Sequence, residues 1–121
     1  MNKITARETV FVDTSGFKAL VDPEDEFHER AVKAWSNLAK VGRVLVTSNY
    51  VLDECYTLIR ARCGINVVSE FRELLAASGK EIRAMRVTLA DEFSAWDWFG
   101  NDWSRLSFTD CVSFAVMKRL G

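Results

Sequence analysis

Three carboxylates that lie far apart in the sequence share one kind of position. Asp13, Glu54 and Asp110 each follow the end of a predicted strand or stand at the start of a predicted helix. In an open parallel sheet, ligands bind in the crevice outside the carboxyl ends of the strands. Carboxylates that gather there repel one another unless a hard cation with oxygen ligands, Mg²⁺ or Mn²⁺, lies between them. Because two such ions can activate water and stabilise the leaving oxygen in phosphodiester cleavage, we expect these residues to be catalytic metal ligands.

The first acid follows the continuous apolar run Val10–Val12, which is typical of a strand buried on both faces of a parallel sheet. Asp13 then stands at the carboxyl end of that strand, with the hydroxyl residues Thr14 and Ser15 after it. We expect these hydroxyls, and that of Thr109 beside the third acid, to contact the metal or orient its ligands. The alternative is that Asp13 only caps the following helix.

The second acid is selected by helical phase. On a helix that starts at Val51, with about 100° between successive residues, the apolar positions centre near Cys55. Glu54 then lies on the flank of the apolar stripe, whereas its neighbour Asp53 lies nearly opposite and should be solvated. The alternative is a surface Glu54 that pairs with a neighbouring arginine.

The third acid belongs to a nearly all-apolar helix that begins at Ser107. Asp110 lies on one row with Phe114 and Met117, and an acid on a buried row is costly unless its charge is compensated. The spacing of Ser107 and Asp110 also matches a capping box, in which the acid bonds back to the helix start. Both roles can hold, because a cap can position a carboxylate at the edge of the sheet.

Strand and helix patterns alternate along the chain, which predicts a parallel sheet with helices on both faces, a three-layer α/β/α fold. The expected strands are 10–13, 44–46 and 82–87, and the expected helices are 17–21, 23–41, 48–63, 67–77, 88–99 and 107–120. Asp22 caps the second of these helices and Pro23 opens it, Thr47 or Ser48 caps the third, and Thr88 caps the fifth. We expect a single domain over 1–121, with 1–8 as a lead-in. Because the pattern ends on a helix, a fourth strand is expected directly after Gly121.

Composition narrows the class of protein. The chain of 121 residues has a formal net charge of −1, which argues against a basic protein that coats a nucleic acid duplex. Three cysteines without a Cys-x-x-Cys pair and the single His28 indicate neither a disulfide framework nor a zinc site. No apolar run approaches the roughly 20 residues of a membrane span, and the N-terminus lacks the apolar core of a signal peptide. We therefore expect a cytoplasmic protein.

Two further groups of residues have a structural interpretation. An aromatic cluster near the last loop is expected to pack in the core, ahead of docking a partner or stacking on RNA. Scattered arginines are expected to be solvated rather than to contact phosphates. The aromatic residues are Trp96, Trp98, Phe99 and Trp103, and the arginines are Arg60, Arg62, Arg83, Arg86 and Arg105.

Taken together, these stretches resemble the PIN-domain family, small metal-dependent ribonucleases that include the toxins of VapBC-type toxin–antitoxin pairs. The similarity runs from about Val10 to Leu120, and its motifs are the runs 10–15, 47–54 and 106–111. Asp13, Glu54 and Asp110 stand where the family has its acids. The resemblance implies cleavage of RNA, inhibition by a cognate antitoxin protein, and a homodimer.

One motif of the family is missing. The family usually follows the last of these helices with a strand that ends in Thr-x-Asp, and this chain stops before it, so its activity stays open. Asp102, in the loop before the last helix, is a candidate for an extra acid. Two alternatives remain: a catalytically inactive PIN-like fold that acts as a binding module, and a receiver-type phosphoacceptor domain.

Overall fold

Three parallel strands form the centre of the molecule in this computed structural model, in the order β1-β2-β3. They are β1 (Thr9–Phe11), β2 (Val44–Ser48) and β3 (Ile82–Met85). The middle strand β2 pairs its Leu45 and Thr47 with Ile82 and Ala84 of β3. All three predicted strands are therefore present, and the fourth strand expected after Gly121 stays a prediction.

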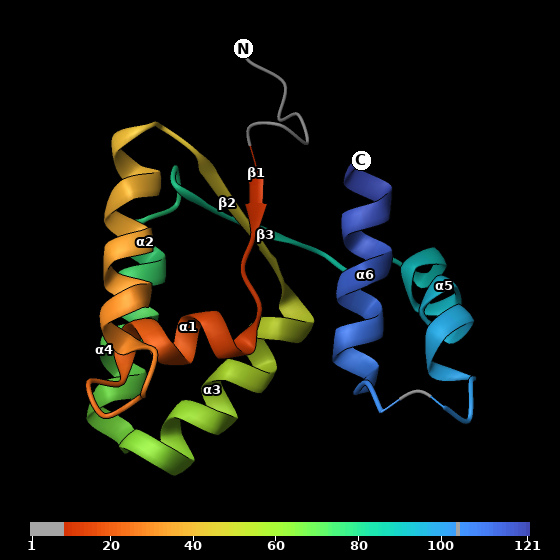
Figure 1. Ribbon diagram of the computed structural model, residues 1–121, viewed down its shortest axis with the longest axis horizontal. Coiled ribbons are helices and arrows are strands. Elements are labelled where there is room, and N and C mark those ends of the chain that lie inside the picture. The colour runs from red at the N-terminus through yellow and green to blue at the C-terminus, as the bar shows by residue number, and fades with distance from the viewer. Residues whose placement is uncertain (1–8, 104) are drawn as a thin grey trace.

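Helices cover both faces of this sheet, so the predicted three-layer α/β/α class is confirmed (Figure 1). α1, α2, α3 and α4 lie on one face, and α5 and α6 pack together on the other. Their bounds are α1 (Thr14–Val21), α2 (His28–Lys40), α3 (Asn49–Cys63), α4 (Ile65–Ala77), α5 (Leu89–Phe99) and α6 (Phe108–Leu120). The structure describes residues 9–103 and 105–121, so the predicted lead-in over 1–8 lies outside the described residues.

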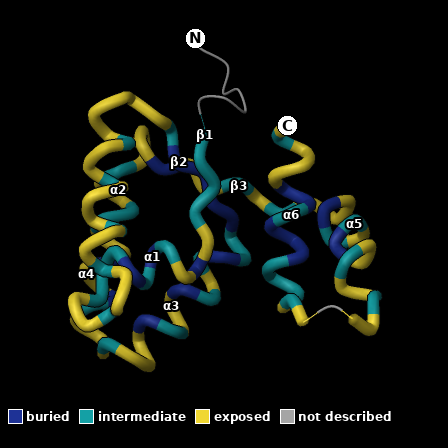
Figure 2. The backbone as a smooth tube through the Cα atoms, viewed as in Figure 1, coloured by how far each residue is buried: buried dark blue, intermediate teal, exposed yellow. Residues whose placement is uncertain are grey.

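Each face of the sheet has its own hydrophobic core. On one face, Leu45 of β2 and Ile82 of β3 pack with Phe17, Ile59 and other apolar residues of α1, α3 and α4. The other core is built on Ala95 of α5 and three residues of α6, with Met85 and Val87 packed against it; the α6 members are Cys111, Val112 and Val116. Buried residues therefore follow β2 and the inner sides of α3 and α6, whereas α2 contains no buried residue (Figure 2).

Local sequence signals set most helix ends. The Ser48 hydroxyl accepts a hydrogen bond from the Val51 amide at 3.2 Å and so caps α3. Gly64 ends that helix with φ of 92°, a left-handed conformation that a residue without Cβ adopts readily. Thr88 and Ser107 cap α5 and α6 through capping boxes. The predicted caps at these helix starts are confirmed.

The predicted start of the second helix is wrong. α2 begins at His28, and residues 22–27 form turns instead. Asp22 accepts a hydrogen bond from the Glu24 amide at 3.0 Å, and Asp25 accepts one from the Phe27 amide at 2.9 Å. Aspartates that bond to an amide two residues on stabilise turns, and here they compete successfully with the helix start.

The predicted core role of the aromatic cluster is also wrong for most of its members. Trp98 does pack against the second core, with its ring centroid 5.7 Å from that of Phe114. Trp96 is 56% exposed, because Ala95 takes the inward position of α5 at this point, and Trp103, in the loop after α5, is 75% exposed. Among the described residues, no helix combines the length and the apolar character that a bilayer crossing requires.

Candidate functional site

A pocket of about 370 Å³ gathers the three predicted acids. Asp13, Glu54 and Asp110 come from the end of β1, from α3 and from α6, and all three line this pocket. Thr14 and Ser15 line it as well. Helical phase thus chose the right neighbour in α3, because Glu54 is half-buried in the pocket wall and Asp53 is exposed to solvent.

The two carboxylate oxygens of Asp13 differ in their hydrogen bonds to the described residues. Its Oδ1 accepts hydrogen bonds from the Gly16 amide and the Ser15 hydroxyl, both at 2.9 Å, so the residue does cap α1. No hydrogen bond from a described residue reaches its Oδ2. A Cβ atom at Gly16 would lie 3.1 Å from Val12 Cγ1 and 3.3 Å from Asp13 Oδ1, so glycine leaves the room that this cap needs. The Ser15 hydroxyl thus holds one oxygen of Asp13, and its role at a metal site stays a prediction.

Glu54 accepts no hydrogen bond from the described residues, so both of its oxygens remain open toward the pocket. Beneath it lies Cys55, which is fully buried. The pKa of the Cys55 thiol is raised to about 12, mainly by burial; a hydrogen bond with Thr14 opposes this rise, and the charges of Glu54 and Asp13 add to it. The thiol therefore stays neutral beside the acidic pocket.

Asp110 combines a capping role with a place in the pocket. Its Oδ2 accepts a hydrogen bond from the Ser107 amide at 3.2 Å, and its own amide donates to the Ser107 hydroxyl at 3.1 Å. Its Oδ1 has no partner among the described residues. The predicted buried row is wrong, because Asp110 and Phe114 are half-exposed and Met117 is 37% exposed. The buried face of α6 is one position further round the helix, where Cys111 points inward.

The donor chemistry of this pocket fits a hard cation. Carboxylate and hydroxyl oxygens are the ligands that Mg²⁺ and Mn²⁺ prefer, and each of the three acids has at least one oxygen without a partner among the described residues. Their spacing is looser than a closed ligand set: within the described ranges, no three His, Cys, Asp or Glu side chains stand close enough to share one ion.

Several predicted contributors lie elsewhere. Thr109 does not line the pocket, and its carbonyl accepts a hydrogen bond from the Ser113 hydroxyl at 2.9 Å. Asp102 is exposed in the loop after α5 and is likewise absent from the pocket wall. The five arginines considered above are all exposed and line no part of this pocket, as expected for solvated charges; they are Arg60, Arg62, Arg83, Arg86 and Arg105.

Sequence reasoning missed one wall of the pocket, which is built by Lys18, Leu58 and the turn residues Asp25, Glu26 and Phe27. The Lys18 ammonium lies 2.8 Å from Asp25 Oδ2 and 3.0 Å from Asp22 Oδ2. Hydrogen bonds to the two carboxylates raise the pKa of Lys18, and its ammonium lowers the pKa of both acids. Only the i,i+4 spacing of Lys18 and Asp22 signals this cluster in the sequence.

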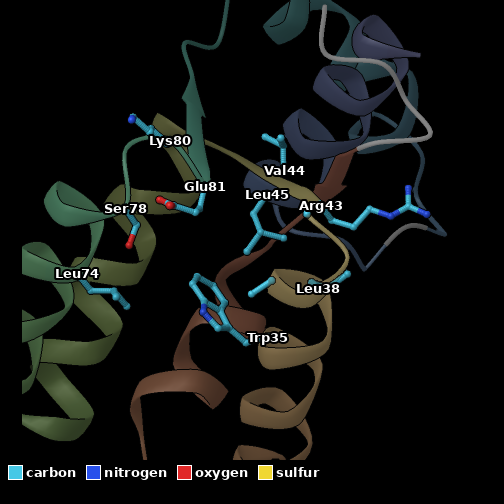
Figure 3. Close-up of a pocket in the computed structure, with 11 residues that line it drawn as sticks. Trp35, Leu38, Arg43, Val44, Leu45, Leu74, Ser78, Lys80 and Glu81 are labelled. Carbon is cyan, nitrogen blue, oxygen red and sulfur yellow. The ribbon is translucent and has the colours of Figure 1, made fainter. Parts of the chain in front are cut away.

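A second cleft of about 390 Å³ lies at the opposite, amino edge of the sheet (Figure 3). Trp35 of α2 and Leu74 of α4 point toward Leu45 of β2 and form an apolar floor, with Lys80 and Glu81 at the rim. Of the described residues that line it, only Glu81 is acidic. This cleft lacks the convergent carboxylates of the first pocket, so the chemistry belongs at the carboxyl edge.

Comparisons with known proteins identify the family of the chain. The family model described as "PIN domain" matches residues 10–121. The 23S rRNA-specific endonuclease VapC20 of Mycobacterium tuberculosis, from strains H37Rv and CDC 1551, is 37% identical over 117 residues, which covers 93% of this chain and 82% of the relative. The crystal structure of M. tuberculosis VapC20, titled a sarcin–ricin loop cleaving toxin, matches with a TM-score of 0.77 and 34% identity, over 90% of this chain and 81% of that one. The chain therefore belongs to the PIN-domain family.

Proposed function

We propose that this chain is a Mg²⁺- or Mn²⁺-dependent endoribonuclease and the toxin of a toxin–antitoxin pair. The observation that carries the proposal is that Asp13, Glu54 and Asp110, from three separate segments, line one pocket at the carboxyl edge of a parallel sheet. Membership of the PIN-domain family and relatives named as rRNA endonucleases support the same conclusion.

In this proposal the three acids hold the cation, through the oxygens that the helix caps leave open. When bound, the cation activates water and stabilises the negative charge that develops on the cleaved phosphodiester. Ser15 holds Asp13 Oδ1 through its hydroxyl, which leaves Asp13 Oδ2 aimed at the ligand. Thr14 supplies a second hydroxyl in the pocket wall.

The substrate we propose is ribosomal RNA in the form of the sarcin–ricin stem–loop. The relatives are named for 23S rRNA and the solved neighbour for this loop. Proteins that act on RNA sequences mostly recognise unpaired loop nucleotides, because the grooves of double-stranded RNA are hard to read. Since such a substrate is ribosomal, the proposed activity is cytoplasmic.

Cleavage of a synthetic sarcin–ricin loop RNA tests the proposal. The wild type should cleave it in Mg²⁺ or Mn²⁺, lose activity in EDTA and recover it when the metal is restored. Glu54→Gln should remove cleavage, whereas Asp53→Asn, the exposed neighbour in α3, should leave it intact. Equal activity of the two variants would overturn the assignment of Glu54, and cleavage that persists in EDTA would overturn the metal requirement.

A second candidate function is an inactive PIN-like binding module. The observation that favours it is the open spacing of the acids, since no three of these side chains in the described part of the chain stand close enough to share one ion. Calorimetric titration of Mg²⁺ and Mn²⁺ into the protein separates the two functions. A nuclease should bind the metal and lose binding in Asp13→Asn, whereas an inactive module should bind no metal at this pocket.

The receiver-type alternative is not retained. Receiver-like doubly wound sheets place the first strand between the second and third. Here β2 is the middle strand, between β1 and β3. The match to the PIN-domain family over residues 10–121 points the same way.

The proposed partners are a cognate antitoxin and a second copy of the chain. Large apolar residues at helical spacing, Leu89, Phe93 and Trp96, are 69%, 70% and 56% exposed on α5. A contiguous exposed apolar surface of this kind is typical of a protein–protein interface. Light scattering after size exclusion should give twice the chain mass, and Phe93→Ser should shift the equilibrium toward monomer.

A further inference from the structure

The turn between α1 and α2 forms one wall of the acidic pocket. Asp25, Glu26 and Phe27 all line the pocket from this turn, on the side opposite α6. The wall therefore faces any molecule that reaches the three acids. Its chemistry differs from theirs, because it presents an aromatic ring beside Asp25, whose charge is already paired with Lys18.

A clamp centred on Lys18 holds this turn in place. The Lys18 ammonium bonds to Asp22 at 3.0 Å and to Asp25 at 2.8 Å, and the Asp25 carboxylate also accepts the Phe27 amide at 2.9 Å. One carboxylate thus links the lysine on α1 to the backbone of Phe27. Because two acids already surround it, the Lys18 ammonium is poorly placed to bind a substrate phosphate.

Phe27 is the exposed part of this wall. It is 51% exposed although it lines a pocket, and it belongs to neither hydrophobic core. The Arg30 guanidinium carbon lies 5.8 Å from the ring centroid, so a cation also stands beside the ring. An aromatic ring with an adjacent arginine is the combination on which unpaired nucleobases stack.

We propose that Phe27 stacks on an unpaired nucleobase next to the cleaved phosphodiester and so helps to select the position of cleavage. Lys18 and Asp25 act as positioning residues, because they fix the turn that carries the ring. This inference rests on the proposed ribonuclease function. A nucleobase is favoured over a protein side chain because the ring shares its pocket with the acids at which the substrate phosphate must lie.

The first test compares cleavage of sarcin–ricin loop RNA by variants of Phe27. Phe27→Ala and Phe27→Leu should each raise KM about 5- to 150-fold, because base–aromatic stacking contributes by that factor to single-strand binding. Phe27→Trp should retain the wild-type KM, since its ring also stacks. Trp103→Ala is the control, since Trp103 is an exposed aromatic residue in the loop after α5 that does not line the pocket, and it should not change KM.

The second test removes the base instead of the ring. Abasic nucleotides are placed one at a time on either side of the cleaved bond. At one of these positions the abasic RNA should raise the KM of the wild type by the same factor by which Phe27→Ala raises KM for intact RNA. For the Phe27→Ala variant, the abasic nucleotide at that position should raise KM no further. Asp25→Ala should raise KM for intact RNA while leaving KM for that abasic RNA unchanged, which a merely destabilising change would not do.

The outcomes separate this inference from the function on which it rests. If the wild type does not cleave RNA, the proposed function fails first. If the wild type cleaves RNA and Phe27→Ala has the same KM for intact RNA, the stacking role is overturned. It is also overturned if the effects of Phe27→Ala and of the abasic nucleotide on KM are independent at every position. Unchanged cleavage by Phe27→Ala with lost inhibition by the antitoxin would likewise overturn it and assign the ring to a protein contact.

Discussion

Two helices of this protein, α5 and α6, begin with the same capping motif, but the carboxylate of that motif has a different role in each. At the start of α5, the Thr88 hydroxyl accepts the Asp91 amide at 3.1 Å, and Asp91 accepts the Thr88 amide at 2.9 Å. At the start of α6, Ser107 and Asp110 repeat this exchange at 3.1 Å and 3.2 Å. Both are capping boxes with aspartate as the third helical residue.

The difference lies in what reaches the other carboxylate oxygen. Arg119 contacts both oxygens of Asp91 at 2.9 Å to 3.2 Å, and Asp91 is only 3% exposed. Asp110 has no such cation among the described residues, and its Oδ1 is open to the pocket that Asp13 and Glu54 also line. A capping role and a ligand role are therefore compatible, and a neighbouring cation decides whether the second role is available.

The largest expected effect is on cleavage in Asp110→Asn. Asparagine keeps a carbonyl oxygen for the Ser107 amide but removes the charge, so the cap should survive while the metal ligand is lost. Loss of several kcal/mol of transition-state stabilisation lowers the rate at least about 100-fold. Steady-state cleavage of sarcin–ricin loop RNA measures this, and urea unfolding should stay within about 0.5 kcal/mol of wild type. Undiminished cleavage would assign Asp110 to capping alone.

An Asp→Asn substitution in the capping box of α5 should lower the stability of the protein and leave cleavage unchanged. Asp91→Asn leaves the Arg119 guanidinium without its counter-charge, which we expect to lower the free energy of unfolding by about 1–3 kcal/mol. The value stays below that of a fully buried pair because the Arg119 side chain is 37% exposed. Urea unfolding measures it, and cleavage at 20 °C by the folded variant should match wild type. A large loss of cleavage in Asp91→Asn would contradict the conclusion that only the capping box of α6 contributes to the site.

Sequence reasoning predicted what depends on local pattern and phase. The three-layer fold, the caps at Ser48, Thr88 and Ser107, and the inward side of α3 all follow from nearest-neighbour spacing and periodicity. These features also placed the three acids at one edge of the sheet, because parallel strands align their carboxyl ends.

What the sequence did not predict depends on partners that are distant in the chain. Arg119 is 28 residues from Asp91, so nothing local marks one capping aspartate as paired and the other as free. The predicted helix 23–41 includes Asp25, because the bond of Asp25 to Lys18 lies outside the pattern of either helix. The exposure of Trp96 likewise depends on α6, whose buried residues pack against Ala95 and Trp98 of α5 and leave Trp96 56% exposed.

Acid titration should sharpen the contrast. Burial alone would raise the pKa of Asp91, but the hydrogen bonds from Arg119 and Thr88 lower it below the ordinary 3.8. A carboxyl with a lowered pKa in the folded state contributes stability above the unfolded-state value and loses it as the pH falls through the folded value. The difference in unfolding free energy between wild type and Asp91→Asn should therefore be constant at pH 5–7 and shrink below about pH 3.8.

Chemical denaturation from pH 7 to pH 2.5 measures this difference. The pKa values of Asp22 and Asp25 are lowered too, by hydrogen bonds from Lys18, but both acids are present in both proteins and cancel in the comparison. A difference that persists at the lowest pH would mean that the Asp91 carboxylate is not the source of the stability.

The smallest expected effects are those of removing the two cap hydroxyls, Thr88 in α5 and Ser107 in α6. Thr88→Ala and Ser107→Ala each remove a hydrogen bond to the amide of the following aspartate, and each should cost about 1 kcal/mol of stability. Only Ser107→Ala should also reduce cleavage, by a few-fold, because Ser107 holds the helix start that positions Asp110 in the pocket. Urea unfolding and cleavage assays on the same preparations test the pair. If both variants lose cleavage in proportion to their loss of stability, the cap at Ser107 stabilises α6 without positioning its carboxylate, and the two boxes differ only in Arg119.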